Sequence, residues 1–253
     1  ANQVLEPPEH MKIHRPLHGQ VALITGSSGG IGAAIARSLA KAGARVCLAA
    51  RRLERISALA EDLRQEYGVR VLAVKTDVTD RNSVRLCQEE VSKLLGQVTI
   101  LINNAGVMHY TLMKNLHEKE WMEAIDVNIK GVLIMTAAML PDMLESERAH
   151  IVNISSNAGK VAFPGLAVYS GTKFFIEGFS ESLRKEVVGT GLKVTTVQPG
   201  DCVSEISHNT TDITAQEQFA QTSTGRNVWL DADDIAQTVL WVLTRPSHVS
   251  IGE

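Results

Sequence analysis

The sequence predicts an α/β fold with a doubly wound parallel sheet and helices on both faces. Short apolar runs rich in β-branched residues alternate with amphipathic stretches from Val21 onward, and a glycine-rich turn follows the first run directly. Strands that helices cover on both faces must be apolar on both faces, as these runs are. Repeated strand–helix–strand units imply right-handed crossovers, and hence a doubly wound sheet.

Strands and helices are expected in alternation along the chain. The expected strands are Val21–Thr25, Arg45–Ala50, Arg70–Lys75, Thr99–Asn103, His150–Ser155 and Lys193–Gln198. The expected helices are Ile31–Ala42, Leu53–Tyr67, Asp80–Leu95, Leu116–Leu144, Val168–Val188 and Asp231–Leu243. Four of these helices are followed by a glycine, which readily takes the left-handed conformation that ends a helix; the glycines are Gly43, Gly68, Gly96 and Gly189. The polar segment 200–227, rich in Thr, Ser and Gln, predicts an irregular loop near the substrate.

Length and composition fit one catalytic domain at 19–253 after a flexible N-terminal arm at 1–18. Because the net charge is −3, nothing favours nucleic acid or an anionic membrane surface as a partner. The longest apolar stretch, Val132–Leu140, is too short to span a bilayer. The three cysteines are widely spaced and form no CxxC pair, which predicts reduced thiols and no metal site. The arm has no apolar core typical of a signal peptide, so the cytoplasm is the expected location.

The turn after the first expected strand has the composition of a phosphate-binding loop. Its glycines permit a sharp turn and let the backbone approach a pyrophosphate, and the helix that follows offers unpaired N–H groups. The alternative is a tight turn with no ligand. Because a strand precedes the turn and a helix follows it, we predict a dinucleotide there. The expected contacts are Gly26, Ser27, Ser28, Gly30, Ile31 and Gly32.

The end of the second expected strand distinguishes NAD from NADP. An acidic residue there would bind the ribose 2′-hydroxyl and repel a 2′-phosphate, but this chain has Ala50 followed by Arg51 and Arg52. A guanidinium can pair with a phosphate through two hydrogen bonds. A solvated arginine pair at a strand end is the alternative. The sequence therefore favours NADP(H).

Tyr169 and Lys173 are four residues apart in an expected helix and so share one face. An ammonium near a phenol favours the phenolate, so we expect Lys173 to lower the Tyr169 pKa. Such a phenol can give a proton to a carbonyl oxygen, or take one from an alcohol, as a hydride moves. The alternative is an exposed Tyr/Lys pair on a helix surface.

Polar residues also follow two other expected strands. Ser155 and Ser156 end one strand, and the segment Asn103–Gly106 ends another. Ligands of parallel sheets gather at these carboxyl ends, where a hydroxyl can hold a substrate oxygen that gains negative charge. For the serines, capping of a turn is the alternative.

Together these motifs resemble those of the short-chain dehydrogenase/reductase family, over nearly the whole length from Gly19 to Gly252. The matching segments are Thr25–Gly32 (TGSSGGIG), Asp77-Val78, Asn103–Gly106 (NNAG), Asn128, Ile154–Ser156, Tyr169–Lys173 (YSGTK) and Pro199-Gly200. The resemblance implies a Rossmann-type sheet of about seven strands, with NAD(P) across their carboxyl ends. The family usually has a final strand and tail after the last helix, and the sequence stops at Glu253, about where that strand would begin.

The resemblance also implies roles for individual residues. Tyr169 would be the general acid/base, and Lys173 would lower its pKa and bind the nicotinamide ribose. Ser156 would bind the substrate oxygen, and Asn128 would hold a water in the proton path to Lys173. Further cofactor contacts are implied for Asp77, Val78, Asn104, Ala105, Gly106, Pro199, Gly200, Val203 and Ser204. Many NADP-preferring members carry a basic residue where this chain has Gly29, so Arg51 and Arg52 would have to supply most of the positive charge.

An apolar pocket with a few polar groups is expected to take a carbonyl or alcohol substrate of the aldehyde, ketone or ketosteroid type. Its expected substrate-binding residues are Ser156, Met108, Asn157, Phe163 and Asp201, with Val107, His109, Leu166 and Cys202 also in the lining. We expect His109 to face solvent and Cys202 to be an unactivated wall residue. In the family the helices matching Leu116–Leu144 and Val168–Val188 pair between subunits, which implies a homodimer or homotetramer; simple packing of both helices on the sheet is the alternative. A silent NADP-binding sensor or scaffold, and an epimerase, are the alternative functions.

Overall fold

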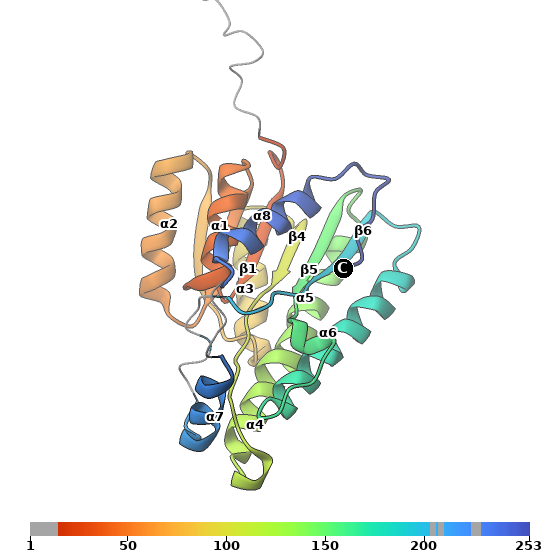
Figure 1. Ribbon diagram of the computed structural model, residues 1–253. Coiled ribbons are helices and arrows are strands. Elements are labelled where there is room, and N and C mark those ends of the chain that lie inside the picture. The colour runs from red at the N-terminus through yellow and green to blue at the C-terminus, as the bar shows by residue number, and fades with distance from the viewer. Residues whose placement is uncertain (1–14, 203–205, 207–209, 224–228) are drawn as a thin grey trace, which may run out of the picture.

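The computed structural model describes residues 15–202, 206, 210–223 and 229–253 (Figure 1). Within these residues six parallel strands form one sheet, in the order β3-β2-β1-β4-β5-β6. The strands are β1 (Val21–Thr25), β2 (Arg45–Ala50), β3 (Val71–Lys75), β4 (Ile100–Asn103), β5 (Ala149–Ile154) and β6 (Leu192–Val197). All six expected strands are therefore confirmed to within one residue at each end. The sheet has six strands where about seven were expected, although the backbone N–H of Thr196 in β6 bonds to the carbonyl of Gly252 at 3.0 Å.

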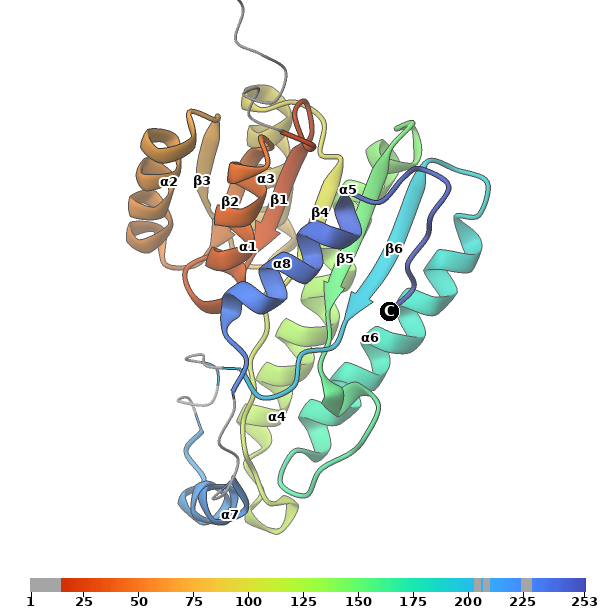
Figure 2. The ribbon, with the colours of Figure 1, turned by 45° about the horizontal axis from the view of Figure 1, so that its top comes forward.

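Alternate residues of each strand enter two separate cores, one on each face of the sheet. In β1, Ala22 and Ile24 belong to one core and Val21 and Leu23 to the other. The first core is closed by α1 (Gly30–Lys41), α2 (Leu53–Tyr67) and α8 (Ala232–Leu243), and the second by α3 (Arg81–Leu94), α5 (Val132–Leu144) and α6 (Ala167–Glu186). Figure 2 shows α8 in front of the sheet and α5 behind it. The doubly wound arrangement is confirmed.

The order of the strands reverses between β1 and β4, which are neighbours in the sheet although β2 and β3 separate them in the chain. At such a switch point the connections after the two strands leave to opposite faces, which opens a crevice at the carboxyl edge. The glycine-rich turn follows β1, and the segment from Asn104 follows β4. The fold thus brings two of the sequence motifs to the place where ligands of such sheets bind.

The four glycines expected after helices all have positive φ angles, and Gly68 (φ 64°) is the C-cap of α2. This agreement follows from local chemistry, because a residue without Cβ takes the left-handed conformation at no steric cost.

The expected long helix at 116–144 is divided into α4 (Glu118–Ile125), a π-helical segment (Asp126–Gly131) and α5. By length and composition, Glu118–Leu144 is the one helix among the described residues that is apolar enough to cross a membrane. Met135, Met139 and Met143 of this helix are fully buried against the sheet. A buried core helix meets the same length and composition test, and these contacts are those of a core helix.

The prediction that 200–227 is irregular throughout is wrong, since α7 (Ile213–Ser223) lies within it. Asp212 precedes the helix, and its carboxylate accepts a hydrogen bond from the backbone N–H of Ala215 at 3.1 Å. Polar residues surround the few apolar ones of α7, so no stripe of apolar residues indicates a helix in the sequence. Asp212 also binds the loop before α4, through the N–H of Leu112 (2.9 Å) and the side-chain amide of Asn115 (2.9 Å).

Candidate functional site

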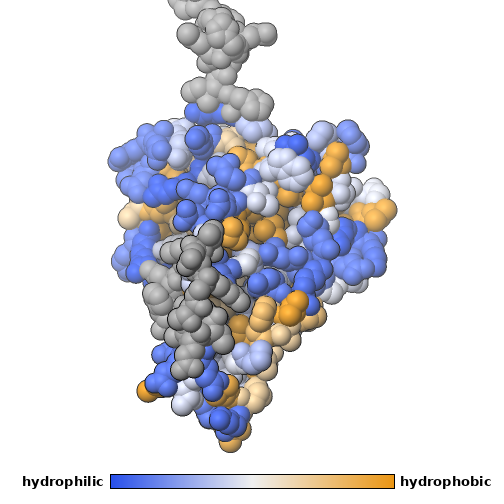
Figure 3. Space-filling view, viewed as in Figure 1, coloured by the Kyte–Doolittle hydropathy of each residue, from blue (hydrophilic) through white to orange (hydrophobic). Residues whose placement is uncertain are grey.

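A cavity of about 690 Å³ opens at the carboxyl ends of β4, β5 and β6. Its wall includes the start of α1, the segments after these strands, the first turns of α6, and part of α7. All five expected substrate-binding residues line it: Ser156, Met108, Asn157, Phe163 and Asp201. Leu166 and Cys202 line it as well, whereas Val107 and His109 are not among the lining residues. Around α4 and the start of α6, Figure 3 shows apolar side chains on the outer surface near this end of the molecule.

Tyr169 and Lys173 lie one turn apart on α6, and both side chains face the cavity. Tyr169 is 7% exposed and Lys173 also 7%. The Lys173 Nζ lies 5.7 Å from the centroid of the Tyr169 ring and donates a hydrogen bond to the Ile154 carbonyl at 2.9 Å. This pair is therefore buried at the cavity wall, and the alternative of an exposed pair is wrong.

Ser156 lies at the end of β5, opposite Tyr169. Its Oγ caps a short 3₁₀ turn by accepting from the N–H of Ala158 at 3.1 Å, and donates to Asn157 Oδ1 at 3.1 Å. A hydrogen bond with Ser156 also acts on the Tyr169 phenol. The Ser156 hydroxyl thus both caps the turn and lies beside the Tyr169 phenol. The neighbouring Ser155 Oγ is buried and has no hydrogen-bond partner among the described residues.

The expected direction of the Tyr169 pKa is wrong. Burial raises the pKa of Tyr169 above its ordinary value, and the hydrogen bond with Ser156 lowers it only in part. Burial lowers the pKa of Lys173 to about 8, which the charge of Glu177 partly opposes. Desolvation disfavours the charged form of both groups, and the ammonium is directed at the Ile154 carbonyl. At pH 7, therefore, Tyr169 is a protonated acid and Lys173 is a cation.

Asn128 lies in the π-helical segment and is 1% exposed. Its side-chain oxygen accepts from the N–H of Val107 at 2.8 Å, and its amide nitrogen donates to the Val107 carbonyl (2.9 Å) and to Thr172 Oγ1 (3.1 Å). Asn128 therefore fastens the segment after β4 to α6. Single π-helical turns within α-helices occur frequently at functional sites.

The glycine-rich turn is packed against the segment after β4. Gly26 has a φ of 65°, and a Cβ on it would lie 2.8 Å from the Cα of Ala105. A Cβ on Gly32 would lie 2.5 Å from Asn104 Nδ2, which donates to the Thr25 carbonyl at 3.0 Å. Larger side chains at these glycines would separate the two segments. Asn104 is thus placed to hold the turn in position.

The N-terminus of α1 is suited to an anion. Gly29 at the N-cap has no side chain to accept a hydrogen bond, and the first turn of α1 contains no acidic residue. The first N–H groups and the positive end of the helix dipole are therefore available to a phosphate group. Ser27 is fully buried, and its Oγ has no hydrogen-bond partner in the described part of the chain.

Arginines lie beside this turn. Arg52 donates from Nε (3.1 Å) and Nη2 (2.9 Å) to Ser28 Oγ. A Cβ on Gly29 would lie 3.9 Å from Arg52 Nη2 and 4.0 Å from Arg55 Nη1. Arg55 therefore stands next to Gly29, the position at which the resemblance to NADP-preferring members led us to expect a basic residue, and sequence reasoning missed it. Its spacing of three from Arg52, in the first turn of a helix, was the available signal.

The remaining expected cofactor residues have varied surroundings. The Asp77 carboxylate accepts from the N–H and hydroxyl of Thr79, at 2.9 and 2.7 Å. Val78 is 9% exposed and contacts Gly131, whose Cβ would lie 2.7 Å from it. Five of the other expected cofactor residues lie in the cavity wall: Ile31, Asn104, Gly106, Pro199 and Gly200. Val203 and Ser204 lie outside the described residues.

His109 does not face solvent as expected, since it is 6% exposed. It lies 3.2 Å from Glu123 Oε2 and 3.9 Å from Glu120 Oε2, both on α4. The sequence does not indicate this burial, which depends on α4 folding back over the segment after β4. Cys202 is half-buried, and burial raises the pKa of its thiol, so it is not an activated nucleophile.

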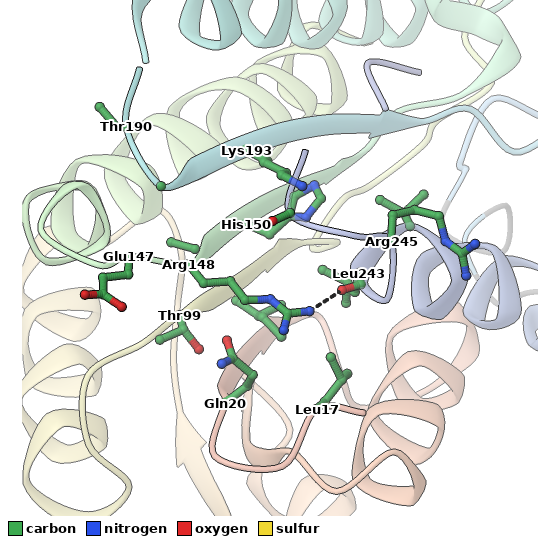
Figure 4. A pocket seen from close by; sticks show the side chains of 15 residues that line it. Leu17, Gln20, Thr99, Glu147, Arg148, His150, Thr190, Lys193, Leu243 and Arg245 are labelled. Carbon is green, nitrogen blue, oxygen red and sulfur yellow. Dashed lines mark hydrogen bonds between the residues drawn. The ribbon is translucent and has the colours of Figure 1, made fainter. Parts of the chain in front are cut away.

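A second cavity, of about 230 Å³, lies at the opposite edge of the sheet (Figure 4). His150, Arg148 and Lys193 line it. Arg148 donates to the Leu243 carbonyl at 3.1 Å, and Lys193 donates to the Val249 carbonyl at 2.5 Å. Burial first, and then the charges of Lys193 and Arg148, lower the pKa of His150 to about 3. The cations here fasten the end of α8 and the segment after it to the sheet, and the cavity contains none of the motif residues.

Comparisons with known proteins identify the family of the chain. A family model described as short chain dehydrogenase matches residues 20–215. A glycine betaine reductase of Emericella nidulans is 44% identical over 94% of this chain. The chain spans only 18% of the length of that relative.

Solved structures match over most of their length. One is an alcohol dehydrogenase from the archaeon Thermococcus sibiricus complexed with 5-hydroxy-NADP, with a TM-score of 0.82, 28% identity, and coverage of 92% of this chain and 94% of the other. Another is a short chain dehydrogenase/reductase from Burkholderia phymatum in complex with NAD, with a TM-score of 0.82, 26% identity, and coverage of 90% and 86%. The chain therefore belongs to the short-chain dehydrogenase family and is an oxidoreductase that uses a nicotinamide cofactor.

Proposed function

We propose that this protein transfers a hydride between NADP(H) and a small carbonyl compound or its alcohol. One observation carries the proposal: Tyr169, Ser156 and Lys173 line one cavity that also reaches Ile31 of α1, next to the glycine-rich turn. A proton donor, a hydroxyl for the substrate oxygen and a cation thus share a wall with an anion-binding helix end.

The residues present fit a dinucleotide. The close contacts at Gly26 and Gly32 leave the turn narrow, and the uncapped start of α1 offers N–H groups to the pyrophosphate. Lys173 would bind the nicotinamide ribose, and Pro199 and Gly200 would flank the ring. Asp77, Val78, Ala105 and Gly106 would border the adenosine half, and we keep Val203 and Ser204 as contacts near the carboxamide.

Bound NADPH would supply the hydride to the carbonyl carbon, and the chain would supply the proton. Since burial raises the pKa of Tyr169, the phenol is protonated at neutral pH and can give its proton to the carbonyl oxygen as the C=O π bond breaks. Ser156 would donate a hydrogen bond to the same oxygen, where negative charge develops. The cationic Lys173 would stabilise the phenolate left on Tyr169. In alcohol oxidation each proton transfer runs in reverse.

Asn128 would support the proton path by holding in place the two segments that border this path. Its bonds to Val107 and Thr172 hold the segment after β4 at a set distance from α6. A water in the path to Lys173 would then occupy a preorganised place.

Preference for NADP over NAD would come from positive charge around Gly29. Arg52 and Arg55 lie beside that residue, Ser28 adds a hydroxyl, and Arg51 is exposed at the end of β2. No acidic residue stands at the end of β2 to repel a 2′-phosphate. Two guanidinium groups can form several charge-assisted hydrogen bonds with that phosphate.

A small substrate fits better than a steroid. The cofactor would fill part of the 690 Å³ cavity, at the end lined by Ile31, Asn104 and Gly106. The name of the 44% identical relative also points to a small compound and to the reductive direction. We therefore favour aldehydes and small ketones, reduced to alcohols in the cytoplasm by a homodimer or homotetramer.

The test compares NADPH and NADH oxidation with a panel of aldehydes, ketones and ketosteroids. We expect turnover with NADPH to exceed turnover with NADH. The Tyr169→Phe variant should bind NADPH normally and lose at least about 100-fold in kcat. Full activity in this variant would reject Tyr169 as the acid, and no turnover of any carbonyl would favour the silent sensor or scaffold.

A further inference from the structure

A mostly buried acid lies one turn beyond Lys173 on α6. The side chain of this acid, Glu177, is 13% exposed. Because residues four apart in a helix share a face, Tyr169, Lys173 and Glu177 follow one another along one face of α6. Carboxylates are seldom buried to this extent unless they are paired or hydrogen-bonded, so the surroundings of Glu177 indicate its role.

Gly159 lies where the end of β5 meets α6. A Cβ on Gly159 would lie 3.1 Å from Glu177 Cγ and 3.1 Å from the Lys173 carbonyl oxygen. It would also lie 2.9 Å from Ser155 Oγ. Ser155 directly follows Ile154, whose carbonyl accepts the hydrogen bond from Lys173 Nζ. The Glu177 side chain is therefore packed near the end of β5 to which the Lys173 ammonium is bonded.

Three neutral groups surround the Lys173 ammonium. The Ile154 carbonyl accepts its hydrogen bond, and the ring of Tyr169, protonated at neutral pH, has its centroid 5.7 Å from Nζ. A Cβ on Gly106 would lie 3.9 Å from this Nζ and 3.3 Å from Asn128 Oδ1. None of these groups offsets the cost of burying the ammonium with a charge of its own.

Glu177 supplies the opposite charge that these groups lack. Burial lowers the pKa of Lys173 to about 8, and the negative charge of Glu177 opposes this change. Asp201 also lines the cavity, but the acid whose charge acts on the pKa of Lys173 is Glu177. A nearby opposite charge favours the charged form of a titratable group.

A cation at the surface is shared between Glu177 and a second acid. Lys160 Nζ lies 3.6 Å from Glu177 Oε2 but 2.5 Å from Glu253 Oε2, and its side chain is 47% exposed. Water screens such an exposed pair. Glu177 Oε2 also accepts hydrogen bonds from Gln198 Nε2 (2.8 Å) and Thr196 Oγ1 (3.5 Å), which hold the carboxylate in place but add no charge. Lys160 therefore neutralises Glu177 only in part.

We propose that Glu177 is a positioning residue for proton transfer, which acts through Lys173 by keeping its ammonium charged while the phenolate forms on Tyr169. Glu177 is not among the described residues that line the cavity, so its effect is transmitted by Lys173. Without its charge, burial makes Lys173 lose its proton at a lower pH, and the phenolate then lacks a neighbouring cation. This inference rests on the proposed reductase function and adds a residue outside the cavity to it.

The first test is the pH dependence of kcat for aldehyde reduction with NADPH. Since reduction uses the Lys173 ammonium, kcat should fall on the alkaline side as Lys173 loses its proton. In Glu177→Gln, which keeps the shape and the acceptor for Gln198, this fall should begin about one pH unit lower. Glu177→Asp keeps the charge and should resemble the wild type. The matched control, Glu181→Gln, removes a 58% exposed carboxylate from the same helix and should leave the profile unchanged.

The second test measures urea unfolding without cofactor, at about pH 7 and about pH 9.5, for Glu177→Gln in the wild-type and Lys173→Met backgrounds. Any change in the contacts of Glu177 with Gln198 and Lys160 occurs in both backgrounds and cancels. With Lys173 present, Glu177→Gln should lower the urea midpoint more at the lower pH, where the folded protein holds the ammonium charged. In the Lys173→Met background the loss should be equal at both pH values.

An unchanged alkaline side in Glu177→Gln, or the same shift in Glu177→Asp, would overturn the inference while the proposed function stands. An equal loss of stability at the two pH values with Lys173 present would do the same. If the wild type reduces no carbonyl, the proposed function fails and the role of Glu177 in proton transfer fails with it. The supporting result is a shift in Glu177→Gln alone, together with a pH-dependent loss of stability that disappears in the Lys173→Met background.

Discussion

The Lys173→Met variant should be inactive but more stable than the wild type. The gain in stability should depend on pH. Lys173 is 7% exposed, and burial lowers its pKa from an ordinary 10.5 to about 8. Each unit of pKa shift corresponds to about 1.4 kcal/mol, so keeping the buried ammonium charged costs on the order of 3 kcal/mol at pH 7. Methionine has a similar length and carries no charge.

The direction in which stability changes with pH follows from proton binding to Lys173. Between pH 8 and 10.5 the folded protein holds fewer protons on Lys173 than the unfolded chain, so wild-type stability rises with pH in this window. The full penalty is present below the folded pKa of about 8 and has vanished above 10.5. At about pH 9.5 only about 1.4 kcal/mol of it remains. The advantage of the Lys173→Met variant should therefore shrink by about 2 kcal/mol between pH 7 and about pH 9.5.

The assay is urea unfolding of wild type and variant at both pH values, without cofactor. Loss of the hydrogen bond to the Ile154 carbonyl also changes stability, but by the same amount at each pH, so it cancels in the comparison. The control is Lys185→Met on the same helix, where the side chain is 73% exposed, and it should change stability by less than about 0.5 kcal/mol at both pH values. An equal effect of Lys173→Met at the two pH values would refute the reasoning.

Three further predictions concern the cofactor, the helix over the cavity and the assembly. Because the Arg55 guanidinium lies beside Gly29, Arg55→Ala should raise the Kd of 2′,5′-ADP, measured by calorimetry, about tenfold, or about 1.4 kcal/mol. The Kd of 5′-AMP should not change, and equal weakening of both ligands would exclude a role of Arg55 at the 2′-phosphate. Asp212→Ala removes hydrogen bonds to Leu112 and Ala215, so limited proteolysis should cut within 210–223 faster than in the wild type, and an unchanged rate would contradict this anchoring. Phe174 is 46% exposed on α6, so Phe174→Glu should yield monomers in light-scattering measurements if α5 and α6 pair between subunits; an unaltered mass would place the interface elsewhere.

Local patterns in the sequence were sufficient for most of the fold. β1 and β2 begin and end where expected, and the glycines after α1 and α2 have the positive φ angles that their positions require. These features depend on neighbours in the chain: alternation of apolar residues, and freedom of the backbone where Cβ is absent. The polar helix α7 has no such pattern, and it was missed because tertiary bonds through Asp212 hold it in place.

The sequence by itself determined which residue types meet at the carboxyl edge of the sheet, since motifs that end parallel strands must gather there. Only the tertiary structure decided their electrostatics. The Tyr169 pKa rises rather than falls because both it and Lys173 are removed from water, and desolvation depends on every element that covers them. For the same reason the structure alone places Arg55 beside Gly29, buries His109 against α4, and sets Asp201 among aromatic rings. Spacing in the chain fixes neighbours along one helix or strand, but burial and contacts between elements exist only once the chain has folded.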